Sequence, residues 1–342
     1  MRGVRVLVLG ATGFIGGAVT RRLGDADVRV LCRDPSKIDA DALGVEVHEG
    51  DLGDPKSIAA AAAGCTHVIN AAGIVSPRAH ARALKWTHVA GTENLINACR
   101  HANVQRLVFM SCTDVTLDNH DRVHWGELKP VPGKPFGARA QSLQLAEDLA
   151  LSASDDQLET VGLRPSWVWG PGDTSRLPGL CAEALSGGIQ LVGGGKNYLA
   201  TTYIDHLVEA TLSALTAEDC AGRAFHIMDP VFQDARDYFA ALSEALGMPK
   251  PRDGKPFAIA WPLARMRGGA AELLQRGRSS LFDFSNACGK LDYDPQVSFE
   301  QGLSALAAWV QEQGGLEAVA ALGKEPPGAS AVDRQVAAAG GD

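Results

Sequence analysis

The chain has 342 residues, of which 46% are hydrophobic, and 40 acidic against 32 basic side chains give it a formal net charge of −8. This length is sufficient for a sizeable buried core, the acidic balance argues against binding nucleic acid, and no apolar stretch is long enough for stable membrane insertion. Seven scattered cysteines form neither a disulfide framework nor a zinc-binding pattern, which predicts a reducing, cytoplasmic location.

The first expected element is a buried strand over residues 4–9, followed by a glycine-rich loop and a helix over residues 14–23. The loop is Gly10-Ala11-Thr12-Gly13-Phe14-Ile15-Gly16. Its first glycine permits a tight turn, its second lets a pyrophosphate approach the backbone, and its third lets the helix pack closely on the strand. Because helix N-termini attract anions, the predicted cofactor contacts here are Gly10, Thr12, Gly13, Phe14, Ile15 and Gly16. The alternative is a plain glycine turn, but the order of strand, loop and helix favours a dinucleotide site.

The residues after the second strand, expected over residues 28–32, indicate which dinucleotide binds. An NAD-preferring protein places an acidic residue here to accept hydrogen bonds from the ribose 2′-hydroxyl. In this chain Arg33 comes first, and Asp34 precedes Pro35 in the pattern of a helix N-cap. Arg33 and Lys37 are therefore predicted to bind a 2′-phosphate, so NADP(H) is the expected cofactor; the alternative is two solvated surface cations.

Further segments resemble the extended short-chain dehydrogenase/reductase superfamily. They are Gly50-Asp51-Leu52, Val68-Ile69-Asn70-Ala71-Ala72-Gly73, Gly91-Thr92-Glu93-Asn94-Leu95, Leu163-Arg164-Pro165-Ser166-Trp167-Val168-Trp169-Gly170-Pro171-Gly172-Asp173, Tyr203-Ile204-Asp205-His206 and Lys290-Leu291-Asp292-Tyr293-Asp294-Pro295. The pattern is similar to the branch of NAD(P)-dependent epimerases and dehydratases, 3β-hydroxysteroid dehydrogenases and dihydroflavonol reductases. The resemblance implies an α/β fold with a Rossmann-like doubly wound parallel sheet and a smaller interleaved C-terminal substrate region. It also implies cofactor contacts at Asp51, Leu52, Ala71, Ala72, Gly73 and Pro165.

At the catalytic positions the chain departs from the pattern that the resemblance implies. The family uses a serine after the fifth strand and a Tyr-x-x-x-Lys pair on one face of the next helix, where the ammonium lowers the phenol pKa. Here Cys112 falls on the serine position, and Phe136 and Ala140 fall on the tyrosine and lysine positions. General acid–base catalysis supplies about 10²–10⁴-fold, so its loss predicts slow reduction of ordinary ketones.

Cys112, Thr113 and His124 are the candidate catalytic residues that remain. Histidine titrates near neutrality, so His120 or His124 could replace the missing acid. The two histidines could also form a metal pair with neighbouring aspartates, but a polar loop near the substrate mouth is favoured, and no metal is expected. Cys112 is either a buried filler or a thiol that faces the pocket.

We expect a nucleotide domain over residues 1–170, to which residues 201–228 return, a substrate region over residues 171–200 and 229–322, and a disordered tail over residues 323–342. Helices are expected over residues 177–186, 231–246, 257–276 and 299–313, with a short strand over residues 189–192 and a turn at residues 193–197. Trp125, Trp167 and Trp169 could line an aromatic pocket or pack in the core. Trp86 and His88 lie on a helix that relatives of this type often use for dimerisation, although core packing explains them equally well.

Together these features predict an atypical NADP(H)-dependent reductase of a small, hydrophobic or aromatic metabolite, with a homodimer as one assembly. Two other classes stay open. The chain could be a redox-silent NADP-binding or regulatory protein, or an isomerase, dehydratase or cyclase that causes no net redox change.

Overall fold

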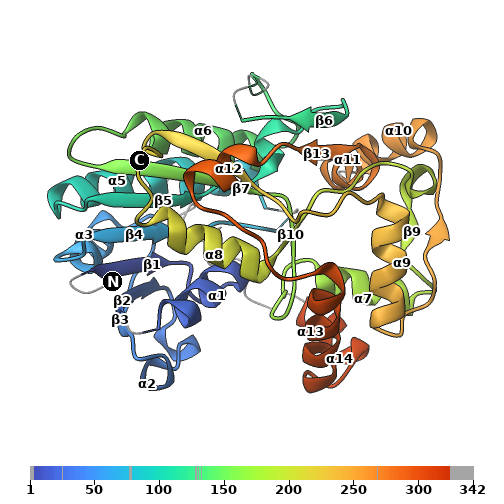
Figure 1. The fold of residues 1–342 in the computed structure, drawn as a ribbon, viewed down its shortest axis with the longest axis horizontal. Coiled ribbons are helices and arrows are strands. Elements are labelled where there is room, and N and C mark those ends of the chain that lie inside the picture. The colour runs from blue at the N-terminus through green and yellow to red at the C-terminus, as the bar shows by residue number, and fades with distance from the viewer. Residues whose placement is uncertain are drawn as a thin grey trace.

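The structure is a computed structural model that describes residues 4–24, 26–76, 79–127, 129, 131, 133–267 and 269–323. Its centre is a seven-stranded sheet with the order β11-β7-β5-β4-β1-β2-β3, in which every neighbouring pair is parallel (Figure 1). The strands are β1 Arg5–Leu9, β2 Asp27–Cys32, β3 Glu46–Glu49, β4 His67–Asn70, β5 Arg106–Met110, β7 Glu159–Pro165 and β11 Arg223–Ile227. Apart from Gly323, the predicted tail lies outside the described residues.

Strand β1 shows how the sheet builds a core on each face. Val6 and Val8 contribute to one hydrophobic cluster, and Leu7 and Leu9 contribute to the other, because successive side chains of a strand point to opposite faces. On the valine side the sheet packs against α1 Phe14–Leu23 and α8 Ile204–Ala214. The other face is covered by α3 Pro55–Ala62 and α5 Gly91–His101, with α6 Ala138–Ser152 packed beside α5. Helices on both faces confirm the predicted doubly wound α/β fold.

The part of the chain predicted to bind substrate is built from shorter elements, most of which lie to the right of the sheet in Figure 1. Its helices are α7 Leu177–Leu185, α9 Ala235–Ala245, α10 Phe257–Arg267, α11 Ala270–Gly277, α12 Ser285–Lys290, α13 Phe299–Glu312 and α14 Leu316–Leu322. Three two-stranded pairs connect it internally and to the nucleotide side: β8 Trp167–Trp169 with β10 Thr201–Tyr203, β9 Gln190–Leu191 with β12 Arg252–Asp253, and β6 Arg122–Trp125 with β13 Ser280–Phe282. The smaller elements are the helices α2 Ala40–Leu43 and α4 Ala81–Lys85, the 3-10 helices η1 Pro35–Lys37, η3 Thr113–Thr116 and η4 Val192–Gly195, and the π-helical segment η2 Trp86–Ala90. No helix that the structure describes is long and apolar enough to cross a membrane.

Several predicted elements need correction. The single helix predicted over residues 257–276 is two helices, because the chain leaves α10 and starts α11 after an N-cap at Gly269. The helix predicted from residue 231 begins only at Ala235, since the side chain of Asp234 caps it. Part of the polar loop predicted around the two histidines is strand β6, which pairs with β13. The last long helix starts as predicted, at a capping box formed by Ser298 and Gln301.

A buried carboxylate joins the two parts of the molecule. Asp229 accepts hydrogen bonds from Trp169 Nε1 at 2.8 Å, Thr201 Oγ1 at 2.7 Å, the Tyr203 amide at 2.6 Å and His206 Nδ1 at 2.8 Å. These donors belong to β8, β10 and α8, so one side chain fixes three elements. Trp169 therefore packs in the core and does not line a pocket.

Candidate functional site

The glycine-rich loop lies where the sequence predicts it, between β1 and α1. Gly10 has a φ of 85°, and a Cβ at this position would lie 2.6 Å from the carbonyl oxygen of Ala71. The amide of Gly13 donates to the Gly10 carbonyl at 2.9 Å, and a Cβ on Gly16 would lie 2.2 Å from that same oxygen. The loop therefore has no space for side chains at Gly10 or Gly16, and it contacts the segment that follows β4.

The start of α1 has the properties of an anion site. Its N-cap is Gly13, no side chain caps it, and its first turn contains no acidic residue, whereas Arg21 and Arg22 complement the opposite end of the helix. The first amides of a helix lack partners within the helix and lie at the positive end of its dipole. A pyrophosphate would satisfy these amides, so the residues present fit a dinucleotide. Of the other predicted loop contacts, Thr12 is exposed, and Phe14 and Ile15 are half-buried.

The two cations predicted to bind a phosphate after β2 are both open to solvent. The Arg33 side chain is 63% exposed, and its Nε lies 3.9 Å from Asp51 Oδ2. Asp34 Oδ1 accepts hydrogen bonds from the Ser36 hydroxyl at 2.6 Å and the Ser36 amide at 3.2 Å, and the hydroxyl contact above all lowers the Asp34 pKa. Lys37 is also open to solvent, 3.8 Å from Asp34. The Asp34 carboxylate, which could otherwise bind ribose hydroxyls, is thus hydrogen-bonded to Ser36, whereas the side chains of Arg33 and Lys37 remain accessible to solvent.

The other predicted cofactor contacts lie at the carboxyl ends of three parallel strands of the same sheet, and these ends share one edge. They are Asp51 and Leu52 after β3, Ala71, Ala72 and Gly73 after β4, and Pro165 at the end of β7. Asp51 Oδ1 accepts a hydrogen bond from the Gly53 amide at 2.8 Å. Leu52 is buried beneath Gly91, where a Cβ would lie 2.9 Å from the leucine Cβ. The fold therefore brings the predicted cofactor residues to a single edge.

Cys112 follows β5 at the same edge, and an arginine contacts it. Burial raises the pKa of the Cys112 thiol to about 12, so the sulfur stays protonated at neutral pH. Arg139 Nη1 lies 3.8 Å from Cys112 Sγ and donates to Asp114 Oδ2 at 2.5 Å. The Arg139 Nε atom is buried and has no hydrogen-bond partner among the described residues. A cation with a free donor therefore lies beside the predicted serine position.

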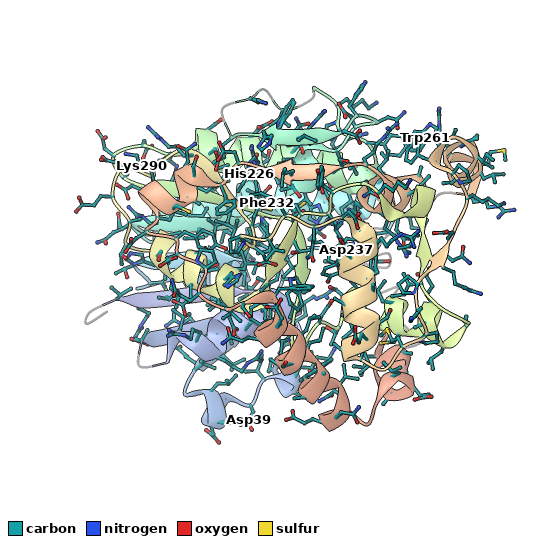
Figure 2. The ribbon with its side chains drawn as sticks, turned by 45° about the vertical axis from the view of Figure 1, so that its right-hand side comes forward. Asp39, His226, Phe232, Asp237, Trp261 and Lys290 are labelled. Atoms are coloured by element: carbon teal, nitrogen blue, oxygen red, sulfur yellow. The ribbon has the colours of Figure 1, made fainter. Side chains whose placement is uncertain are left out.

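Phe136 and Ala140 do not share a helical face, which corrects the expected start of the catalytic helix. Helix α6 begins only at Ala138, after Gly137 with a φ of 93°. Phe136 precedes the helix, and its ring packs against Trp261 of α10 with the ring centroids 5.3 Å apart; Figure 2 labels Trp261 at the periphery of the molecule. Ala140 is buried in the first turn of α6. That these two residues occupy the tyrosine and lysine positions stays a prediction.

His88 attaches the first turn of α6 to the segment after β4. It is 4% exposed, its Nε2 accepts from the Ile74 amide at 3.1 Å, and its Nδ1 lies 2.8 Å from the Ser142 hydroxyl, which donates to the Arg139 carbonyl at 2.9 Å. Because Nε2 accepts, the neutral ring carries its proton on Nδ1. Burial, with a smaller effect of the Arg139 charge, lowers the His88 pKa to about 4. His88 is therefore an interior residue that positions Arg139, whereas Trp86 is 39% exposed.

A cavity of about 50 Å³ that opens to solvent lies beside Asp114, the carboxylate that binds Arg139. Its walls come from η3 and the segment that follows it, from β8, and from α11 and β13. Thr113, His120 and Trp167 line it, whereas His124 is an exposed residue of β6 that does not. Of the predicted catalytic residues, Thr113 therefore lines the cavity and Cys112 directly precedes it in the chain, whereas His124 lies outside. The alternative acid, His120, is part of the cavity wall.

Two arginines near this site are absent from the residues predicted from sequence. Arg139 could have been found, because Pro135 and Gly137 both disfavour helix and so move the first turn beyond Phe136. Arg176, which lines the cavity, follows a strand and an irregular loop, and no local pattern in the sequence indicates where its side chain points.

The sheet, the glycine loop and the residues at its carboxyl edge define a Rossmann-type dinucleotide-binding protein. A family model described as the NAD dependent epimerase/dehydratase family matches residues 6–227. The chain belongs to the NAD-dependent epimerase/dehydratase family.

Similar proteins of known name include several reductases. A 2-alkyl-3-oxoalkanoate reductase from Stenotrophomonas maltophilia is 32% identical over 329 residues, which cover 89% of this chain and 99% of the relative. A 4-hydroxy-2-methyl-3-oxo-4-farnesyl-3,4-dihydroquinoline-1-oxide ketoreductase from Stigmatella aurantiaca is 28% identical and covers 89% of this chain and 96% of its own. Among solved structures, UDP-glucose 4-epimerase from Thermotoga maritima matches with a TM-score of 0.75 and 19% identity, over 90% of this chain and 99% of its own. At that identity the likeness establishes the fold alone.

Proposed function

We propose that the protein is a cytoplasmic NADP(H)-dependent reductase that acts on the carbonyl group of a small, hydrophobic or aromatic metabolite. The observation that carries this proposal is the Arg139 guanidinium beside Cys112, at the sheet edge where the predicted cofactor residues meet. The names of the reductase relatives support the reaction class. The open side chain of Arg33 supports NADP(H) as the cofactor, and the seven free cysteines support a reducing compartment.

NADPH, when bound, supplies the hydride, and the residues of this chain orient the carbonyl and stabilise its developing charge. Arg139 supplies a cation beside Cys112, and its charge would stabilise a negative oxygen that forms at this edge of the sheet. Burial opposes the charged guanidinium, but Cys112 and Asp114 together raise the Arg139 pKa above its ordinary value. Arg139 therefore keeps its proton and cannot act as a general acid. The proton for the product hydroxyl then comes from water in the cavity.

The pH dependence of turnover follows from this assignment. Neither the Arg139 guanidinium nor the Cys112 thiol changes its protonation state between about pH 5 and 9. A reductase that uses them should show no ionisation near neutrality that belongs to a catalytic histidine. A rate that depends on pH near 6–7, and loses that dependence in His120→Ala, would instead identify His120 as the acid.

The test measures NADPH oxidation by nicotinamide absorbance against a panel of 3-oxo acids and simple ketones. Arg139→Gln should lower kcat by about 10²–10³-fold, as removal of one oxyanion donor does in other enzymes. The matched control is Arg265→Gln, because Arg265 is an exposed arginine on α10 outside the cavity. A fully active Arg139→Gln protein would contradict the role assigned to Arg139.

A redox-silent NADP-binding protein is the second candidate. The observation in its favour is that the cavity lining contains neither a tyrosine nor a lysine within the described part of the chain. Tight NADPH binding without turnover across the whole panel would support this function. Conversion of a substrate without cofactor would instead support an isomerase, dehydratase or cyclase.

A homodimer remains a separate proposal, with the exposed ring of Trp86 as the residue that we place in its interface. Light scattering of the native chain and of Trp86→Glu tests it. A monomer in both samples would contradict it.

A further inference from the structure

The charged residues around the cavity leave an excess of positive charge. Arg122, Arg176 and Arg278 line it together with Asp114 and Asp118. Asp118 forms an ion pair with Arg122. Asp114 forms one with Arg139, which approaches from α6 behind the lining. The cavity lining and Arg139 behind it thus contain four guanidinium groups and two carboxylates.

Among the described residues neither Arg176 nor Arg278 has a carboxylate partner, and Arg176 forms fewer side-chain hydrogen bonds than Arg278. The guanidinium carbon of Arg176 lies 4.3 Å from the centre of the Trp167 ring, and its Nη1 donates to Gln275 Oε1 at 3.2 Å. Among the described residues it forms no ion pair and no other side-chain hydrogen bond, although a guanidinium has five N–H donors. Arg278 differs, because it donates twice to Asn119 and covers the Phe257 ring.

The backbone that carries Arg176 is fixed by a buried aspartate. Asp173 is 3% exposed, and its Oδ1 accepts hydrogen bonds from the Ser175 amide at 2.8 Å and the Arg176 amide at 2.9 Å. Its Oδ2 accepts from the Leu177 amide at 3.1 Å. Together with the stacking on Trp167, this turn pre-organises the guanidinium, so that little rotamer freedom is lost when an anion binds.

The rest of the cavity wall mixes polar residues with an apolar part. The apolar part is formed by Leu117, Trp167, Leu199, Leu274 and Phe282. A ligand that satisfied Arg176 would therefore place a hydrocarbon part against these side chains, and burial of that part would favour binding.

We propose that this cavity binds a carboxylate with a hydrocarbon chain, and that Arg176 is its anchor. A carboxylate can form a bidentate pair with the planar guanidinium of Arg176. Among the described residues, the only side-chain hydrogen bond of this guanidinium is to Gln275, so its other N–H groups can donate to the carboxylate.

The position of the anchor also narrows the substrate of the proposed reductase, and this step rests on that proposed function. Gln275 Nε2 donates to Asp114 Oδ1 at 2.8 Å, and Asp114 binds Arg139. Only two side chains thus connect Arg176 to the cation beside Cys112. A substrate held by Arg176, with its carbonyl near Asp114 and the Arg139 charge behind it, would carry the carbonyl close to its carboxylate, so the substrate class is a short- or medium-chain oxoacid.

The experiment measures binding to the full chain by calorimetry, without nucleotide, using octanoate, octan-1-ol and octyl phosphate. The wild-type protein should bind octanoate at least about 10-fold more tightly than octan-1-ol, because an ionic hydrogen-bonded contact adds to the same apolar contact. Arg176→Gln should weaken octanoate binding by about 10–100-fold and change octan-1-ol binding little. Arg176→Lys should lie between them, since an ammonium keeps the charge but loses the bidentate geometry.

Arg265→Gln is the matched control, because Arg265 also lies over a tryptophan ring, 6.0 Å from the centre of Trp261, yet is exposed and outside the cavity. It should bind all three probes as the wild type does. Equal wild-type affinities for octanoate and octan-1-ol, or undiminished octanoate binding by both Arg176 variants, would overturn the inference. Tighter binding of octyl phosphate would overturn the choice of a carboxylate.

The two proposals fail in different ways. Octanoate binding that depends on Arg176, without NADPH oxidation by any oxoacid, would support the cavity assignment and contradict the reductase. NADPH oxidation that is equally efficient with uncharged ketones and with oxoacids would support the reductase and contradict the anchor.

Discussion

The buried histidine at the base of the site makes stability sensitive to acid in a way that can be calculated. His88 has its pKa lowered to about 4 by burial and, to a smaller extent, by the Arg139 charge. The pKa of His88 in the folded state lies below its pKa in the unfolded state, which is near 6.5. The neutral, buried ring therefore contributes fully to the free energy of unfolding above pH 6.5. This contribution to the free energy of unfolding is lost as the pH falls from 6.5 towards 4, because His88 binds a proton in the unfolded chain but stays neutral in the folded chain. From these two values, the loss between pH 7.5 and 4.5 is about 2.5 kcal/mol, and between pH 7.5 and 5.5 about 1.4 kcal/mol.

Comparison with His88→Asn isolates this contribution. Asparagine does not titrate, and its amide can still accept from the Ile74 amide and donate towards Ser142. Urea unfolding at pH 7.5, 5.5 and 4.5 should therefore show a stability difference between the two proteins that shrinks, or reverses in favour of His88→Asn, by about 2.5 kcal/mol on acidification. All other titrating groups, including buried His226, are common to both proteins and cancel. A difference that stays constant from pH 7.5 to 4.5 would refute the reasoning.

Three further outcomes test other parts of the structure. Arg33→Glu should reduce the ratio of NADPH to NADH affinity by about 10–100-fold, as read from parallel fluorescence titrations, and equal titration curves in the native protein would already contradict the NADP assignment. Gly16→Ala forces a Cβ to within 2.2 Å of the Gly10 carbonyl oxygen, so thermal unfolding should show a loss of about 1–3 kcal/mol together with weaker nucleotide binding. Glu147→Gln removes the charge opposite Arg164, whose Nε lies 2.8 Å away, and should cost about 3–5 kcal/mol in urea unfolding because a buried cation is left uncompensated; a loss below 1 kcal/mol would contradict that account.

The parts of the molecule that the sequence predicts well are those whose reason is local. Strand β1, the loop from Gly10 to Gly16 and the start of α1 follow each other within twenty residues, and each glycine is explained by a backbone conformation or a close contact. The cap at Asp34 is equally local, since Ser36 lies two residues away. Such features require no knowledge of where distant segments meet.

The substrate side could not be predicted in the same way, because its contacts are long-range. Gln275 and Asp114, which hydrogen-bond beside Arg139, are 161 positions apart, and neither belongs to a recognisable motif. The break between α10 and α11 is different, because the local pair Gly268-Gly269 encodes it and the prediction of one helix over residues 257–276 overlooked that signal. Phe136 was expected within a helix but precedes α6, and the ring that it contacts, Trp261, lies far along the chain.

The pairing of β6 with β13 has a consequence for the newly made chain. Asp121 and Ser279, at the beginning of this pair, share a hydrogen bond of 2.8 Å and are 158 positions apart. A ribosome that adds about 5–20 residues per second needs roughly 10–30 s to synthesise the residues between the two strands. Strand β6 therefore cannot pair with β13 during this interval. The glycine loop and its flanking strands are complete long before. A nascent chain can therefore form its nucleotide-binding loop well before α11 and β13, which form part of the cavity wall, have been synthesised.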